Sequence, residues 1–136
     1  MKRIVFLVSA GSVALMGVAG LALFSEEPKP QPLTLPLDCP SGYCTLLQGV
    51  PQTAGMRSGL VRLKPAESIG EHTTGKNEES LVVIRGRGEA HIEGHPAVPF
   101  TAPALVYIPS DSRHDVVNTG TELLEYVYVV APTPAH

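Results

Sequence analysis

Two imidazoles and one carboxylate are the side chains of this sequence best suited to chemistry. His72 and Glu79 stand on either side of a Gly-Lys-Asn turn at residues 75–77, and His114 follows Pro109 by five residues. Two imidazole nitrogens and one carboxylate can hold Fe(II), Mn(II) or Zn(II) and leave coordination positions open for a ligand. We therefore predict a divalent metal site formed by His72, Glu79 and His114.

Strand geometry explains how these residues can meet. Alternate side chains of an extended strand share a face, so His72 and Thr74 are expected to project in the same direction. After the turn the chain returns antiparallel, which can place Glu79 opposite His72. Leu81 and Val83 share the face of Glu79 and are expected to line the space below it. An apolar cup with a few converging polar groups is typical of a small-molecule site.

The part of the chain that positions these residues has an all-β pattern. From Gly55 onward, short apolar segments recur about every 8–12 residues between Gly, Pro and Asn, as in a sandwich or barrel. The predicted strands cover residues 57–63, 69–73, 80–85, 88–93, 97–100, 104–108, 115–118 and 123–130, with an earlier edge strand at 45–47. We predict one closed barrel at residues 55–131, without helices, and a C-terminal tail at 132–136.

The N-terminal residues 1–24 form a separate segment. Lys2 and Arg3 precede a run without charge, Ile4 to Phe24, which would span about 30 Å as a helix and so match a membrane core. This length favours an uncleaved anchor over a secretory signal, whose apolar run is about 7–15 residues. Gly20-Leu21-Ala22 would nevertheless serve as a cleavage site. Both alternatives export the rest of the chain and leave the two basic residues inside.

Residues 25–54 are predicted to be a spacer, because five prolines between Ser25 and Pro40 favour an extended chain. The spacer carries both cysteines of the chain, Cys39 and Cys44. In an exported protein such a close pair can form a disulfide, whereas a reducing compartment would leave two free thiols. The spacing differs from that of a two-residue redox motif, and no further zinc ligands lie nearby. We predict the disulfide.

The charge of the exported part argues against a nucleic-acid partner. Beyond Phe24 the chain retains eight of its ten Lys and Arg residues against thirteen Asp and Glu residues, a net charge of about −5. Nucleic-acid binding requires a basic face. The expected partner is therefore a small molecule, in addition to the membrane that the N-terminal segment would contact.

The region around the predicted metal ligands resembles the cupin superfamily, of the small conserved-barrel type. The first cupin motif, G-x5-H-x-H-x(3–4)-E-x6-G, is matched by His72, Glu79 and Gly86, and the second, G-x5-P-x-G-x2-H-x3-N, by Pro109, His114 and Asn118. The resemblance implies a double-stranded β-helix, or jelly-roll barrel. Thr74 replaces the second histidine of the first motif, and Asp111 replaces a glycine of the second. Asp accepts turn geometry, whereas Thr74 removes one of the four metal ligands that family members share.

This resemblance leaves two functions open. The first is a metal-dependent oxygenase, isomerase or decarboxylase, in which Thr74 and Arg113 would lie beside the substrate. The alternative is a metal-free cupin whose His72, Glu79 and His114 form a hydrogen-bonded polar cluster, and which binds or senses a small molecule at the cell envelope. Whether the protein is an enzyme is not decided by the residues. The resemblance also suggests a homodimer formed through the sheets.

Overall fold

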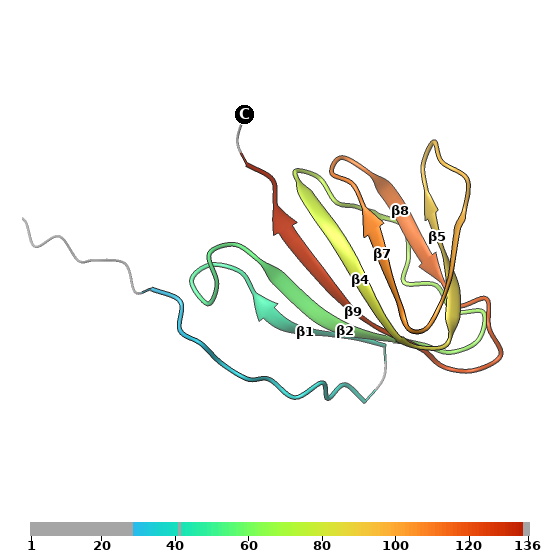
Figure 1. Cartoon of the computed structure of the whole chain (residues 1–136), viewed down its shortest axis with the longest axis horizontal. Helices are drawn as coiled ribbons and strands as arrows, with labels where there is room; N and C mark the ends of the chain where they lie inside the picture. Colours follow the sequence, from blue (N-terminus) through green and yellow to red (C-terminus); the bar gives the residue numbers. More distant parts are fainter. Residues whose placement is uncertain (1–28, 41, 135–136) are drawn as a thin grey trace, which may run out of the picture.

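The computed structural model describes residues 29–40 and 42–134, and its strands form two facing sheets. The strands are β1 (Gly42–Gln48), β2 (Arg57–Leu63), β3 (His72–Thr73), β4 (Asn77–Arg85), β5 (Arg87–Ile92), β6 (Val98–Thr101), β7 (Ala104–Ile108), β8 (Arg113–Val117) and β9 (Leu124–Pro132). One sheet has the order β1-β2-β9-β4-β7, and the other has the order β3-β8-β5-β6 (Figure 1). The described residues contain no helix, so the predicted all-β jelly-roll class is confirmed.

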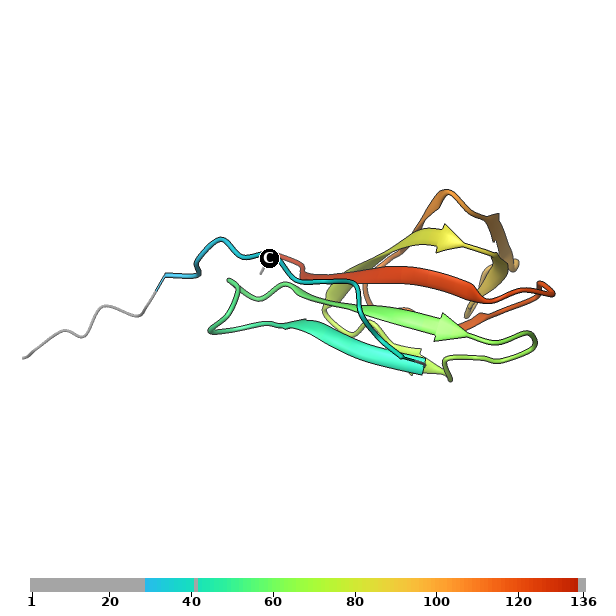
Figure 2. The same cartoon turned by 90° about the horizontal axis from the view of Figure 1, so that it is seen from below.

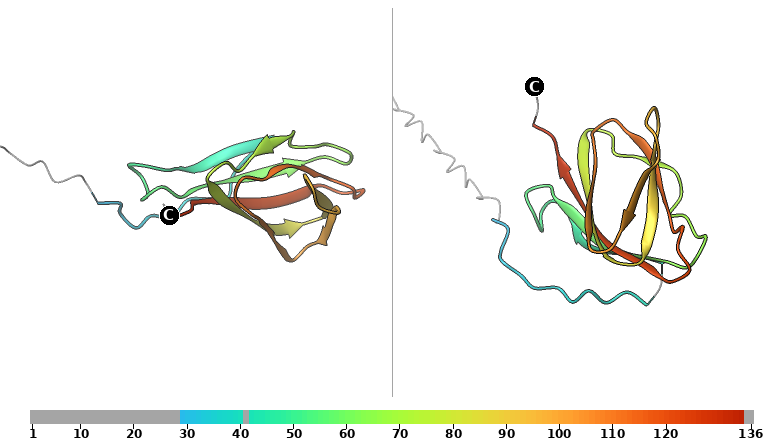
Figure 3. Two further views of the ribbon diagram at one scale, coloured as in Figure 1. Left: turned by 90° about the horizontal axis from the view of Figure 1, so that it is seen from above. Right: turned by 45° about the vertical axis from the view of Figure 1, so that its right-hand side comes forward.

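The core fills the space between the two sheets because apolar side chains alternate along the strands. In β4, Leu81 and Val83 are almost fully buried, whereas Val82 is 44% exposed on the outer face. Val116 of β8 and Ala90 of β5 meet them from the smaller sheet. Figure 3 shows the two sheets that enclose this core, with β1 and β2 in cyan and green on one side and the yellow β5 on the other.

Most strands lie where the apolar pattern predicted them, and β3 differs most. The expected strand at residues 69–73 is reduced to His72–Thr73. Gly70 has a φ of +94°, which bends the chain, and its N–H donates to the Asp115 carboxylate instead of a ladder carbonyl. Ser68 keeps only an isolated bridge to Val117. The short β3 pairs with β8 and holds His72 directly opposite His114.

Strand β1 lies at the edge of the larger sheet, which confirms the edge strand predicted at 45–47 within the spacer and lengthens it. It pairs with β2 along its whole length, and a bulge between Thr45 and Leu47 shifts the register. The disulfide that joins Cys39 to Cys44 ties the preceding chain to β1, and Arg62 of β2 donates to the Cys39 carbonyl. Figure 2 shows β1, β2 and β9 side by side, with the described residues 29–40, in blue, passing along them. The apolar run at 4–24 lies outside the described residues, among which no helix is long and apolar enough to cross a membrane.

Two turn residues explain parts of the sequence motifs. Gly86 has a φ of +83°, and a Cβ there would lie 2.6 Å from the Leu123 carbonyl oxygen, so only glycine fits between β4 and β5. Asp111 stands where the cupin motif has glycine and adopts a φ of +54°. Its N–H donates to the Gly75 carbonyl at 2.7 Å, which joins the β7–β8 turn to the β3–β4 turn. The aspartate thus accepts the turn geometry, as expected.

Candidate metal centre

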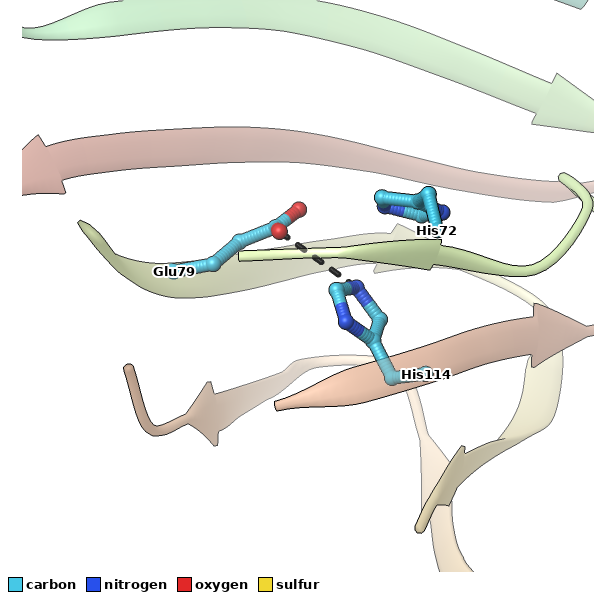
Figure 4. A group of neighbouring side chains, drawn as sticks. All are labelled: His72, Glu79 and His114. Carbon is cyan, nitrogen blue, oxygen red and sulfur yellow. Dashed lines mark ion pairs between the residues drawn. The ribbon is translucent and has the colours of Figure 1, made fainter. Parts of the chain in front are cut away.

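Three side chains from three strands converge between the sheets. His72 comes from β3, Glu79 from β4 and His114 from β8, and one ligand atom from each lies within 4.8 Å of the others. Figure 4 shows the two imidazoles approaching from the smaller sheet and the carboxylate from the larger one. The imidazole centroids are 4.2 Å apart, as expected for residues that pair across β3 and β8. The structure therefore brings together the three residues that the sequence selected.

His114 is the most buried of the three, with 1% of its surface exposed. Its Nε2 lies 3.4 Å from Glu79 Oε2 and has no hydrogen-bond partner among the described residues. Burial alone would lower the pKa of His114, but the Glu79 carboxylate, and to a lesser degree the Ser112 carbonyl, outweigh burial and raise it. A buried nitrogen without a hydrogen bond is costly unless another group satisfies it. A metal ion would do so, because neutral imidazole is a good ligand.

His72 is oriented by its backbone surroundings. Its Nδ1 lies 2.8 Å from the Gly70 carbonyl, so this nitrogen carries the proton in the neutral ring and Nε2 is left as an acceptor. The Gly70 N–H in turn donates to Asp115 at 3.0 Å and to Ser68 at 2.9 Å. Such a partner on the second ring nitrogen is the usual support of a metal-ligating histidine. The tautomer of His72 thus suits coordination through Nε2.

Glu79 supplies the only carboxylate of the group. It is 7% exposed and faces inward, as do Leu81 and Val83 of the same strand. Glu78, one residue earlier, is exposed on the outer face and accepts a hydrogen bond of 2.8 Å from Tyr107. Because neighbouring residues of a strand face opposite sides, only Glu79 can meet the two imidazoles. Two nitrogens and one carboxylate oxygen, with open positions, fit a divalent metal.

Thr74, which replaces a histidine of the cupin motif, is held by the backbone. Its hydroxyl donates to the Pro109 carbonyl at 2.9 Å and accepts from the Ser112 N–H at 3.0 Å. The side chain is 5% exposed and borders the cavity described below. The contact of Thr74 with a substrate stays a prediction. In this structure its hydroxyl already has two hydrogen-bond partners, both of them backbone groups. In this structure Thr74 ties the β3–β4 turn to the segment that carries His114.

Arg113, the second residue predicted to lie beside a substrate, does not border that cavity. It precedes His114 in β8 and therefore points to the opposite face. Its guanidinium forms an ion pair with Glu71, and this hydrogen bond raises the pKa of Arg113. The contact with a substrate stays a prediction, and the geometry gives Arg113 a different partner.

A cavity of about 860 Å³, lined by His72 and Glu79 but not by His114, extends toward β1. Its walls include Tyr43 and Gln48 of β1, Arg57 of β2 and Tyr128 of β9, which the sequence analysis missed. Burial raises the pKa of Tyr128 to about 12, and the hydrogen bond to Tyr43 acts in the same direction. The volume is within the usual range of about 300–1,000 Å³ for small-molecule sites.

Comparison with known proteins agrees with this geometry. The family model for the cupin domain matches residues 59–130, just over half of the chain. The chain belongs to the cupin family. This match includes all three candidate metal ligands, whereas strand β1 and the disulfide lie before it.

The individual proteins that resemble this chain differ from it at most of the aligned positions. A protein named polyketide synthase CurC, from Streptomyces cyaneus, is 35% identical over 85 residues, which cover 60% of this chain and 54% of that protein. The chain thus matches only about half the length of this relative. Among solved structures, a protein from Bacillus halodurans has a TM-score of 0.66 at 21% identity, covering 79% of this chain and 85% of its own. A conserved-barrel cupin from Salinispora arenicola has a TM-score of 0.58 at 28% identity, covering 79% and 92%.

Replacing Thr74 tests its structural role. Thr74→Val keeps the shape of the side chain but leaves the Ser112 N–H and the Pro109 carbonyl without this partner, so we expect unfolding free energy to fall by about 2 kcal/mol. Thr101→Val, which changes an exposed threonine of β6, is the control and should change stability by less than about 0.5 kcal/mol. Urea denaturation with a chelator present measures both. Equal stability of the two variants would contradict the role given to Thr74.

Proposed function

We propose that this protein binds one divalent metal ion through His72, Glu79 and His114 and uses it to bind an oxygen-bearing small molecule in the adjoining cavity. The observation that carries the proposal is His114 Nε2. This buried nitrogen has no hydrogen bond to any residue that the structure describes, and it faces a carboxylate and a second imidazole. Two of the three side chains, those of His72 and Glu79, also line a cavity large enough for a small molecule. Bound there, the metal would supply Lewis-acid or redox chemistry at its open positions.

The chain's own residues would control how a ligand approaches. Val61, Ile69 and Val116 line the cavity near the proposed metal position and would exclude water from the ligand. Glu79 is the only carboxylate among the three ligands and would offset part of the metal charge. The name of the Streptomyces relative supports an oxygen-rich ligand of the kind found among polyketides. An oxygenase, isomerase or decarboxylase reaction would each be compatible with this arrangement.

A second candidate is a metal-free cupin that binds its ligand without turnover. Thr74 in place of a third histidine supports this alternative, because the family's full set of four ligands is incomplete. The contact between His114 and Glu79 supports it as well, since a protonated imidazole can satisfy a buried carboxylate. In this case the side chains that line the cavity, without a metal ion, would provide the affinity for the small-molecule ligand.

Metal titration separates the two candidates. The full chain, purified in detergent and stripped with a chelator, should bind one Zn(II) or Mn(II) ion per chain by elemental analysis after dialysis. His72→Ala and His114→Ala should each weaken metal affinity at least about 100-fold, because each removes one of three ligands. His91→Ala, which changes an exposed histidine of β5, should bind as the parent does.

Two results would count against the metal proposal. If the His72→Ala and His114→Ala variants carry as much metal as the parent, the metal lies elsewhere. If the parent binds no metal while Thr74→His does, the metal-free candidate is correct.

We further propose that the barrel is exported and held near the membrane by residues 4–24. The basic and then apolar N-terminal sequence supports this, and the Cys39–Cys44 disulfide suits an oxidising compartment. In cells that produce the full chain, Cys39 and Cys44 should not react with a membrane-permeant alkylating reagent until a reductant opens the disulfide. Mass spectrometry of the alkylated chain is the measurement. Complete alkylation without reductant would argue for a reducing compartment and against export.

A further inference from the structure

One wall of the cavity is built from a row of paired residues that begins at the proposed metal ligand Glu79. The row crosses the inner face of the larger sheet from β4 to β1 and consists of Glu79, Val130, Arg57 and Gln48. Two strand spacings separate Glu79 from Arg57, which places their Cα atoms about 10 Å apart. A ligand bound at the three metal ligands can therefore extend along this row toward Arg57, with Val130 beneath it.

Strand β1 contributes residues to the cavity because of its bulge. Regular alternation would turn residues 43, 45 and 47 inward. The bulge after Thr45 shifts the register by one residue, so that Leu47 pairs with Ser58 and Gln48 pairs with Arg57. Tyr43, Thr45 and Gln48 consequently all border the cavity. The disulfide at Cys44 fixes the start of this strand beside Tyr43.

Tyr43 provides a flat aromatic surface next to the row. Its ring stacks on Tyr128 with centroids 5.3 Å apart and an interplanar angle of 9°, and the two hydroxyls are 2.5 Å apart. Gly59 makes room for this pair, since a Cβ there would lie 2.6 Å from the Tyr128 hydroxyl. Tyr43 is 55% exposed although one face of its ring packs on Tyr128. The other face can therefore stack on a planar ligand.

The end of the cavity away from the proposed metal ligands carries the positive charge of Arg57. Arg57 forms no ion pair within residues 29–40 and 42–134, and its side chain borders the cavity. Glu71 also borders the cavity, but its charge is paired with Arg113. The Gln48 side chain adds an uncharged amide beside Arg57. With a divalent ion bound by Glu79 and two neutral imidazoles, the cavity would carry net positive charge and favour an anion.

We propose that this cavity binds a flat, conjugated carboxylate of about two fused rings, with an oxygen donor at the metal end, its plane against Tyr43 and its carboxylate on Arg57. This inference rests on the proposed metal site for one end of the ligand only. Arg57 offers a guanidinium fork that matches a carboxylate. Tyr43 and Arg57 then determine which ligands bind, and both lie before the residues that match the cupin family model.

A fluorescent probe tests the inference on the full chain. 6-Hydroxy-2-naphthoate has the required plane and an oxygen at each end, and 2-naphthol lacks only the carboxylate. The protein contains no tryptophan, so energy transfer from its four tyrosines to the naphthalene can report binding. Zn(II)-loaded protein should bind the naphthoate at least about tenfold more tightly than 2-naphthol, the gain expected for one charged hydrogen-bonded pair.

Matched variants assign this affinity to residues. Arg57→Met should remove the tenfold preference for the naphthoate, while Arg85→Met, which changes an exposed arginine of β4, should keep it. Tyr43→Leu should weaken both probes about 3- to 10-fold, the size of an aromatic stacking contribution. Tyr107→Leu is its control, because Tyr107 is 54% exposed on the outer face of the same sheet. Tyr43→Phe keeps the ring and should retain the binding of 2-naphthol even if Tyr43→Leu folds poorly.

The results also separate this inference from the metal proposal. Binding of the naphthoate to chelator-stripped protein that Arg57→Met still weakens would support the cavity assignment while the metal proposal fails. Normal metal binding, together with naphthoate affinity that neither Arg57→Met nor Tyr43→Leu changes, would overturn the cavity assignment and leave the metal proposal standing.

Discussion

The pairing of His72 with His114 across two short strands, opposite a carboxylate from the facing sheet, is the constraint on which the proposed site depends. It places His114 Nε2, which has no hydrogen-bond partner among the described residues, in the interior beside the Glu79 carboxylate. Burying such a group costs free energy that apolar packing alone does not return. The surrounding hydrogen bonds hold this arrangement in place, from Asp115 through Gly70 to His72, and from Thr74 to the segment before His114.

The same constraint links the two halves of the barrel. His72 and His114 belong to the smaller sheet and Glu79 to the larger one, so an ion bound between them would join the two sheets. Metal binding would then be expected to stabilise the fold as well as to create the site. The cavity beyond the ion is formed mainly by the larger sheet, in which β1 lies at the edge. The proposed metal chemistry thus belongs to residues within the cupin match, and the proposed ligand selection belongs to residues that precede it.

Much of the site could be predicted from the sequence, because its residues follow local rules. Alternation in β4 places Glu79 with Leu81 and Val83, and the spacing around His72 and His114 matched a known pair of motifs. The same alternation also indicates that Arg113 faces away from its neighbour His114. An edge strand at 45–47 could be predicted, but its contribution to the cavity could not, since that depends on long-range pairing with β2 and on a bulge that no local pattern reveals. Tyr43 was missed for that reason. Arg57 lies in a predicted strand, but its place beside the cavity follows from pairing with β9 and β1, which no local pattern reveals.

A crystal structure of the protein loaded with Zn(II) or Mn(II), with anomalous scattering recorded at the metal edge, tests the central claim most directly. The account predicts one strong anomalous peak between the sheets, about 2.0–2.2 Å from Nε2 of His72, Nε2 of His114 and a carboxylate oxygen of Glu79. Full-occupancy metal at a different position, or an empty site with His114 Nε2 bonded directly to Glu79 under saturating metal, would contradict it.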